Sequence, residues 1–88
     1  SAPVLEAIVK MKDLGALKID YENFEVAIQR DLWNMKDENW RINFCTNIVT
    51  HSFANQFEEA QKLVLIKDLE ENVIADFKLD KKSLEYYN

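Results

Sequence analysis

His51 is the only histidine of the chain, and it is the first residue to consider for proton-transfer chemistry. If residues 40–57 form a helix, His51 lies at nearly the same angle as Trp40 and Phe44, and Glu58 follows two turns later. His51 could then be a general base oriented by Glu58, or one ligand of a metal site. No Glu-x-x-His or His-x-x-x-His spacing supplies further ligands for zinc or a di-iron centre. We therefore predict no metal site, and we interpret His51 as a structural or exposed residue.

Other residue types that act as nucleophiles or bind phosphate also lack a suitable context. Cys45 is the only cysteine, and on a helix it points well away from His51, so a Cys–His pair is geometrically poor. We expect its small side chain to pack in the core. Ser52 and Ser83 have no nucleophile-elbow sequence around them, and a single glycine cannot form a phosphate-binding loop. The sequence therefore predicts no catalytic residues, no cofactor and no enzymatic activity.

Residues 17–24, with the sequence LKIDYENF, resemble the second half of an EF-hand loop and the start of its exit helix. When the loop is aligned on its central apolar position, Lys12, Leu14 and Ala16 fall where the first three oxygen ligands belong. None of these side chains can bind calcium through a side-chain oxygen. We therefore predict no calcium site, and we do not assign the chain to that family.

The charge balance limits the classes of partner. The 88 residues include 11 basic and 16 acidic ones, which gives a formal charge of −5. Nucleic acids and anionic membranes attract basic surfaces, so we expect neither as the ligand. No apolar run reaches the ~18 residues of a transmembrane helix, and no signal-peptide pattern is present. A lone cysteine is typical of a reducing compartment. We expect a cytoplasmic protein with one helical domain over residues 1–88.

The elements that position these residues are predicted to be helices. The chain has one glycine and one proline, and it lacks the Asn-Gly and Asp-Gly pairs that are typical of tight hairpin turns. Residues 40–57 have apolar side chains around more than half of a helical circumference, which is typical of an element with neighbours on several sides. This stretch is therefore predicted to be the central helix, with Asp37 or Asn39 as its N-cap.

The remaining helices are predicted from their end signals and from the apolar period. Gly15 is suited to the left-handed cap position after the first helix, and Asp20 is suited to the N-cap of the second. In chain order, the predicted helices cover residues 3–14, 20–35, 40–57 and 55–77. The predicted fold class is all-α, a small bundle of four helices, or of five if residues 80–88 add a short one.

An α+β fold is the alternative. Residues 40–50 alternate apolar and polar side chains at their start and are rich in β-branched residues, so they could form a strand. Residues 62–67 and 73–79 also alternate and could pair as a hairpin near 62–79. The turn between them, DLEEN, lacks glycine, which counts against the hairpin.

The surplus of apolar positions, together with the lack of catalytic residues, favours a protein–protein interaction module with a regulatory, adaptor or assembly role. Aromatic residues concentrate binding energy, and exposed carboxylates attract basic partners. The residues predicted to contact a partner are Trp33, Trp40, Val64, Leu65, Glu58, Glu59, Tyr86 and Tyr87. Homodimerisation through the face with Val64 and Leu65 is one form of this function. The alternative is an inhibitor or immunity-type protein that neutralises a basic, nucleic-acid-binding partner through its acidic face.

Overall fold

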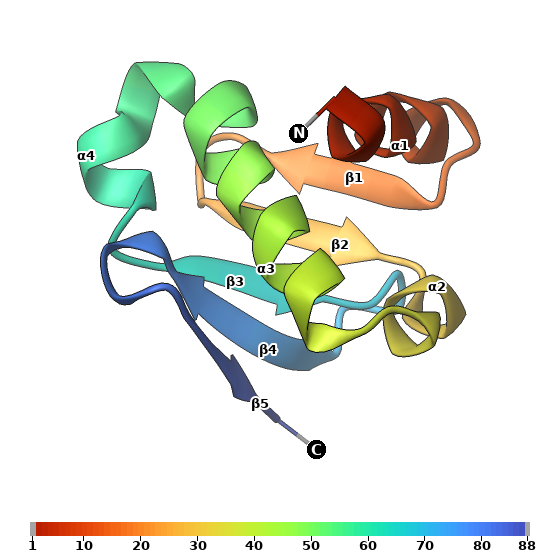
Figure 1. Ribbon diagram of the computed structural model, residues 1–88. Coiled ribbons are helices and arrows are strands. Elements are labelled where there is room, and N and C mark those ends of the chain that lie inside the picture. Colours follow the sequence, from red (N-terminus) through yellow and green to blue (C-terminus); the bar gives the residue numbers. More distant parts are fainter. Residues whose placement is uncertain (1, 88) are drawn as a thin grey trace.

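The chain folds as a five-stranded sheet with the helices on one side of it, as the computed structural model shows (Figure 1). The structure describes residues 2–87. In chain order the elements are α1 (Ala2–Asp13), β1 (Leu17–Asp20), β2 (Glu25–Ile28), α2 (Arg30–Met35), α3 (Glu38–Asn47), the π-helical η1 (Ile48–Ser52), the 3-10 turn η2 (Ala54–Gln56), α4 (Phe57–Ala60), β3 (Val64–Lys67), β4 (Val73–Lys78), the 3-10 turn η3 (Leu79–Lys81) and β5 (Ser83–Tyr86).

The strands lie in the sheet in the order in which they occur in the chain, β1-β2-β3-β4-β5. Three of the four neighbouring pairs are antiparallel, and β2 and β3 are parallel. A parallel pair needs a crossover connection, and here the segment from α2 to α4 provides it. Consequently, β2 and β3 both begin at the same end of the sheet, although they are far apart in the sequence.

Alternate residues of each strand point to opposite faces of the sheet. Val26, Ile28 and Ile66 point toward the helices and are fully buried. Their neighbours point to the other face, which no described helix covers and which is called the open face below. The residues of the open face are Lys18, Asp20, Glu25, Ala27, Leu65, Lys67, Asp76, Lys78 and Glu85.

The core lies between the helices and the sheet. Three phenylalanines, Phe44, Phe53 and Phe77, are fully buried there and come from α3, the turn after η1, and β4. Large aromatic side chains bury much apolar area each, so they matter in a domain of this size. The other buried apolar residues of the core are Val4, Ile8, Met11, Leu17, Val26, Ile28, Trp33, Cys45, Ile48, Val49, Ala60, Val64, Ile66, Ile74 and Ala75.

The prediction of an all-α bundle is wrong, because hairpin turns form here without glycine. Three non-glycine residues have positive φ, namely Phe24 at 55°, Glu71 at 73° and Lys82 at 48°. Each lies in the turn that joins two antiparallel strands. Side chains normally disfavour this left-handed region, so the rarity of glycine argued against a sheet. Gly15 does have φ 74°, in the position predicted for it after the first helix.

The predicted helix over residues 20–35 is wrong, and Asp20 is the reason. Its carboxylate accepts hydrogen bonds from the backbone N–H groups of Glu22 (3.0 Å) and Asn23 (3.1 Å). The same short-range acceptor geometry caps a helix or closes an Asx turn. Here it closes the turn between β1 and β2, and only Arg30–Met35 is helical.

The predicted helix over residues 55–77 is also wrong, since β3 and β4 form an antiparallel hairpin there. That hairpin was part of the α+β alternative, and it is present. The strand of that alternative near residues 40–50 is absent, because α3 and η1 are helical throughout that range. The predicted central helix is therefore present, although its α-helical part ends at Asn47. Residues 83–86 form β5 in place of a fifth helix, and Asn88 lies outside the described residues.

Candidate protein-binding surface

A hollow of about 340 Å³ opens at the end of the sheet where β2 and β3 begin. It is called the end hollow below, and its lining residues are Asn23, Phe24, Glu25, Glu59, Leu63 and Leu65. The parallel pairing of β2 and β3 builds it, because Phe24 and Leu63 each directly precede one of these strands. The backbone N–H of Leu65 donates to the carbonyl of Phe24 (3.1 Å), which fixes the distance between the two sides.

Apolar side chains form one part of the end hollow. The side chain of Leu63 is 45% exposed, and those of Phe24 and Leu65 are half-buried. The ring of Phe24 packs edge-to-face against the buried ring of Phe53, with 5.6 Å between the centroids. This contact anchors Phe24 to the core, so the hollow has a preformed apolar wall.

Carboxylates border the end hollow on the side of β2 and α4. Glu25 and Glu59 line the hollow itself, and Glu22 and Glu58 directly precede its lining residues Asn23 and Glu59 in the chain; these four carboxylates are called the acidic corner below. Glu25 forms an ion pair with Lys67 on the open face, with 2.7 Å between Oε1 and Nζ. The other three are exposed and form no ion pair with any described residue. They are therefore available to a cationic group from outside the chain.

Three lysines lie at the turn between β4 and β5, together with the exposed Asp80, and a fourth, Lys62, lies in the turn between α4 and β3. The group consists of Lys62, Lys78, Lys81 and Lys82 and is called the basic corner below. The backbone N–H of Asp80 donates to the carbonyl of Gln61 (3.2 Å), which holds this turn beside the residue that precedes Lys62. Within the described part of the chain, none of the four lysines forms an ion pair.

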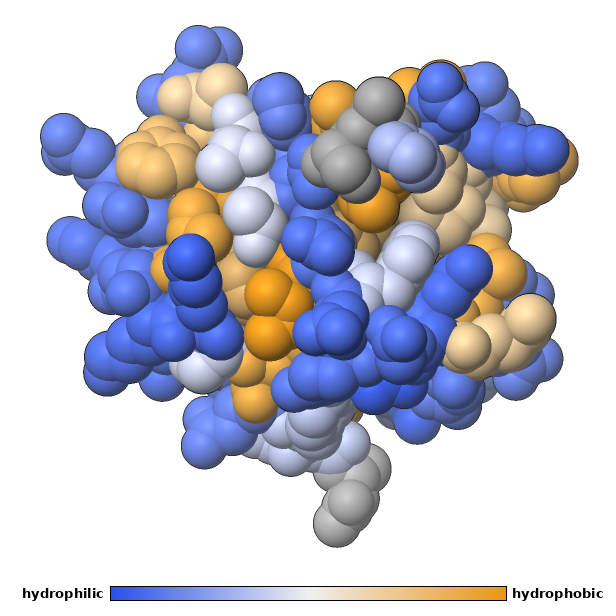
Figure 2. Space-filling view, in the orientation of Figure 1, coloured by the Kyte–Doolittle hydropathy of each residue, from blue (hydrophilic) through white to orange (hydrophobic). Residues whose placement is uncertain are grey.

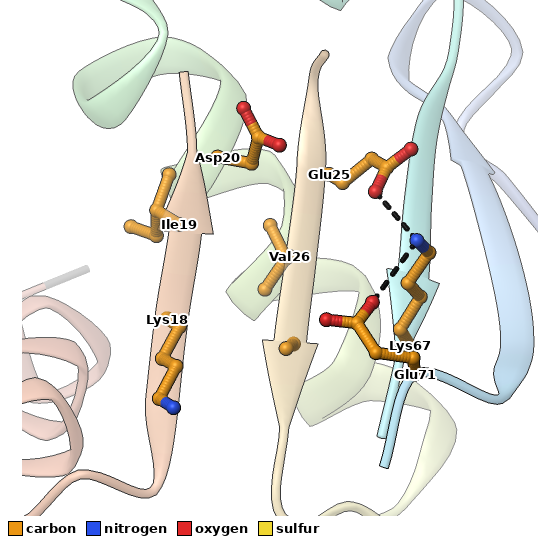
Figure 3. A pocket seen from close by; sticks show the side chains of 8 residues that line it. Lys18, Ile19, Asp20, Glu25, Val26, Lys67 and Glu71 are labelled. Atoms are coloured by element: carbon orange, nitrogen blue, oxygen red, sulfur yellow. Dashed lines mark hydrogen bonds and ion pairs between the residues drawn. The ribbon is translucent and has the colours of Figure 1, made fainter. Parts of the chain in front are cut away.

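A second hollow, of about 300 Å³, lies on the open face beside β1, β2 and β3 (Figure 3). Lys67 is held between two carboxylates, Glu25 at 2.7 Å and Glu71 at 3.2 Å. Hydrogen bonds to these two groups raise the pKa of the Lys67 ammonium above its ordinary value. Asp20 also lines this hollow, and its pKa is lowered by hydrogen bonds from Asn23. Lys18 also lines this hollow and forms no ion pair with a described residue, but the other charges already have partners within the chain, so the second hollow has less to offer to a ligand than the end hollow.

The structure brings together three of the residues predicted to contact a partner. Leu65 and Glu59 line the end hollow, and Glu58 is exposed beside Glu59 on α4. In contrast, Trp33 and Val64 are buried in the core, 3% and 1% exposed, so neither side chain is accessible to a partner. Of the two residues predicted to carry a homodimer face, Val64 is therefore buried and only Leu65 reaches the surface.

The other three predicted residues lie elsewhere. The Trp40 ring stacks on that of Phe44, with 5.1 Å between the centroids. The hydroxyl of Tyr86 donates to Glu38, and that of Tyr87 donates to Asp76 on the open face. Burial and the bond to Glu38 raise the pKa of Tyr86. These aromatic side chains tie β5 and α3 to their neighbours and do not reach the end hollow.

Sequence reasoning missed two apolar residues of the end hollow. Phe24 and Leu63 fall within the helices predicted for residues 20–35 and 55–77. Their exposure depends on the pairing of β2 with β3, which no local pattern reports. The local signals of a turn there are Asp20, which closes it, and the polar residues Glu22 and Asn23 just before Phe24.

The residues that could do chemistry are not assembled into a site. The imidazole of His51 is exposed on η1 and forms no hydrogen bond or ion pair with Glu58 or another described residue. Cys45 is 2% exposed, and burial raises the pKa of its thiol well above the ordinary value. Among residues 2–87, no group of three or more His, Cys, Asp or Glu side chains could hold a metal ion.

The side of the molecule that carries the helices is mostly hydrophilic. Figure 2 shows charged and polar side chains over most of this side, with apolar atoms only in separate patches. In the part of the chain that the structure describes, no helix is both long enough and apolar enough to cross a bilayer. The end hollow joins an exposed apolar side chain to carboxylates without an ion-pair partner, which makes it a candidate binding surface. Comparison of the chain with models of protein families, with curated proteins and with solved structures finds no match.

Proposed function

We propose that this chain is a protein-binding module without catalytic activity, and that the end hollow is its binding surface. The observation that carries the proposal is the exposed apolar side chain of Leu63 beside Phe24 and Leu65, in a hollow bordered by unpaired carboxylates. An apolar centre with a charged rim is the usual composition of a protein–protein interface.

The composition of the end hollow favours a protein over other ligand classes. Phosphate groups of a nucleic acid would be attracted by the basic corner but repelled by Glu22, Glu58 and Glu59, which lie beside the apolar side chains. A small-molecule site is usually a cleft that buries most of its ligand. The end hollow lies on the surface, and exposed residues form part of its lining. A protein partner could place an apolar side chain against Leu63 and neutralise the carboxylates from the rim.

Site-specific photo-crosslinking tests this proposal. A photo-crosslinking amino acid replaces Glu59, which is exposed and lines the end hollow, and the chain is produced in the cells that normally make it. We expect an adduct of defined mass. Leu63→Asp in the same chain should lower its yield by at least about tenfold, because a buried carboxylate would replace an apolar contact.

The matched control places the same crosslinker at Met35, which is 77% exposed at the end of α2. No adduct of defined mass is expected from this position, although an apolar side chain is exposed there as well. Equal yields from Glu59 and Met35, or an adduct that persists with Leu63→Asp, would show that the end hollow is not the binding surface.

A further inference from the structure

We infer that the partner of the end hollow is a second copy of this chain, bound across a twofold axis. This inference rests on the proposed function, since it names the occupant of the same surface. Its basis is that one chain carries acidic, apolar and basic groups next to one another. Two copies could therefore pair each acidic group with a basic one and bury the apolar groups between them.

The strand order arranges these groups in a row across the end of the sheet. The acidic corner lies with β2 and α4, the apolar side chains of Leu63 and Leu65 lie with β3, and the basic corner lies at the turn between β4 and β5. In Figure 1 the segment that leads from α4 into β3 passes next to the turn that leads to β5. The sequence of the row is therefore negative, apolar, positive.

A twofold axis through the apolar centre makes this row complementary to itself. In such an interface the same patch of both subunits is used, and a contact between two different parts occurs twice. Leu63 would lie near the axis and contact the apolar centre of the second copy. The acidic corner of each copy would then face the basic corner of the other. Rows with a single sign of charge could not pair in this way, because like charges would meet.

The basic corner argues against a simple cationic partner. A segment rich in lysine or arginine would be attracted to Glu22, Glu58 and Glu59 but repelled by the four lysines beside them. An acidic segment would meet the opposite problem. A second copy satisfies both corners at once, and it does so with groups that form no ion pair within the described chain.

Charge exchange between two variants tests the inference. The first variant carries Lys81→Glu and Lys82→Glu in the basic corner, and the second carries Glu22→Lys and Glu59→Lys in the acidic corner. In each variant one corner then carries both signs of charge and no longer attracts the intact corner of a second copy, so each variant alone should associate with itself at least about tenfold more weakly than the unmodified chain. An equimolar mixture should restore a species of twice the monomer mass in light scattering, since the intact acidic corner of the first variant meets the intact basic corner of the second and the exchanged charges face each other.

A matched control separates this effect from net charge. Lys10→Glu with Lys12→Glu, on the exposed side of α1, changes the net charge by the same amount as the first variant. It should leave self-association within about twofold of that of the unmodified chain, because α1 is not part of the row. Circular dichroism of every variant checks that the fold is retained.

The outcomes distinguish this inference from the proposed function. If the unmodified chain stays monomeric at all concentrations, the second copy is excluded, and an adduct of Glu59 with a different protein would still support the binding surface. If the chain dimerises but the mixture of variants fails to restore the dimer, the interface lies elsewhere and the inference is wrong. A monomer without any adduct from Glu59 would overturn both.

Discussion

Replacing Phe44 with alanine should lower the free energy of unfolding by about 3–5 kcal/mol, the range found for fully buried phenylalanines. Phe44 is 0% exposed at the centre of α3. Its ring contacts Trp33 edge-to-face and stacks on Trp40, with centroid distances of 6.3 Å and 5.1 Å. Alanine would leave a cavity that neither tryptophan can fill, because both rings also pack against other parts of the fold.

Urea unfolding followed by tryptophan fluorescence measures this loss. A domain of this size buries a limited core, so a loss of this magnitude is a large share of its total stability. The control is Phe57→Ala on α4, where the side chain is 38% exposed and a change of below about 1.5 kcal/mol is expected. If both variants lose the same stability, α3 is not the element on which the core is built.

The position of Phe44 was predictable because the central helix has strong local signals. Residues 40–57 are apolar on several sides, and Asp37, one of the two predicted caps, accepts a hydrogen bond from the backbone N–H of Trp40 (2.8 Å). The first helix and Gly15 were predictable for the same reason. A helix is specified by contacts within a few residues, which a sequence pattern reports directly.

The sheet was harder to predict, because the residues in its turns are also compatible with helices. Asp20 suits a helix cap as well as an Asx turn, and the positive φ of Phe24 follows from the pairing of β1 with β2. Ile66 of β3 and Val73, Ile74 and Phe77 of β4 fit one arc of a helix as well as they fit a hairpin, whereas Val64 and Leu65 fall outside that arc. Tertiary contacts decide between these readings, and a single sequence does not contain them explicitly.

The candidate site shows the same limit. Its carboxylates at Glu58 and Glu59 could be predicted from charge alone, and Leu65 from its apolar neighbours. The hollow itself exists because Phe24 and Leu63 begin two parallel strands that are separated by the whole helical crossover. A surface made from distant segments leaves no local pattern in the sequence. The aromatic residues Trp33, Trp40, Tyr86 and Tyr87 were predicted as contacts instead, because their residue type alone suggests binding.

The turn between β3 and β4 should make the stability of the protein depend on pH through Asp68. This carboxylate is almost fully buried and accepts hydrogen bonds from Arg30 at 2.8 Å and 3.1 Å, and from the backbone N–H groups of Glu70 and Asn72. The Arg30 guanidinium is the main cause that lowers the pKa of Asp68 from 3.8 to about 2. The ionised form is therefore bound more favourably in the folded state than in the unfolded state.

Because the folded pKa lies below the unfolded value, the contribution of Asp68 is present in full above pH 3.8 and is lost as the pH falls to about 2. Asp68→Asn removes the charge at every pH, so it should destabilise the protein at pH 7. The difference in stability between the two proteins should shrink between pH 4 and pH 2, measured as denaturant midpoints across this range.

The control is Asp31→Asn. Asp31 is exposed in the first turn of α2 and forms no ion pair with a described residue, so this variant should show no such change with pH. If the stability difference between Asp68→Asn and the unmodified protein is equal at pH 2 and pH 7, the charge of Asp68 does not stabilise the turn. The hydrogen bonds and shape of the side chain would then be sufficient.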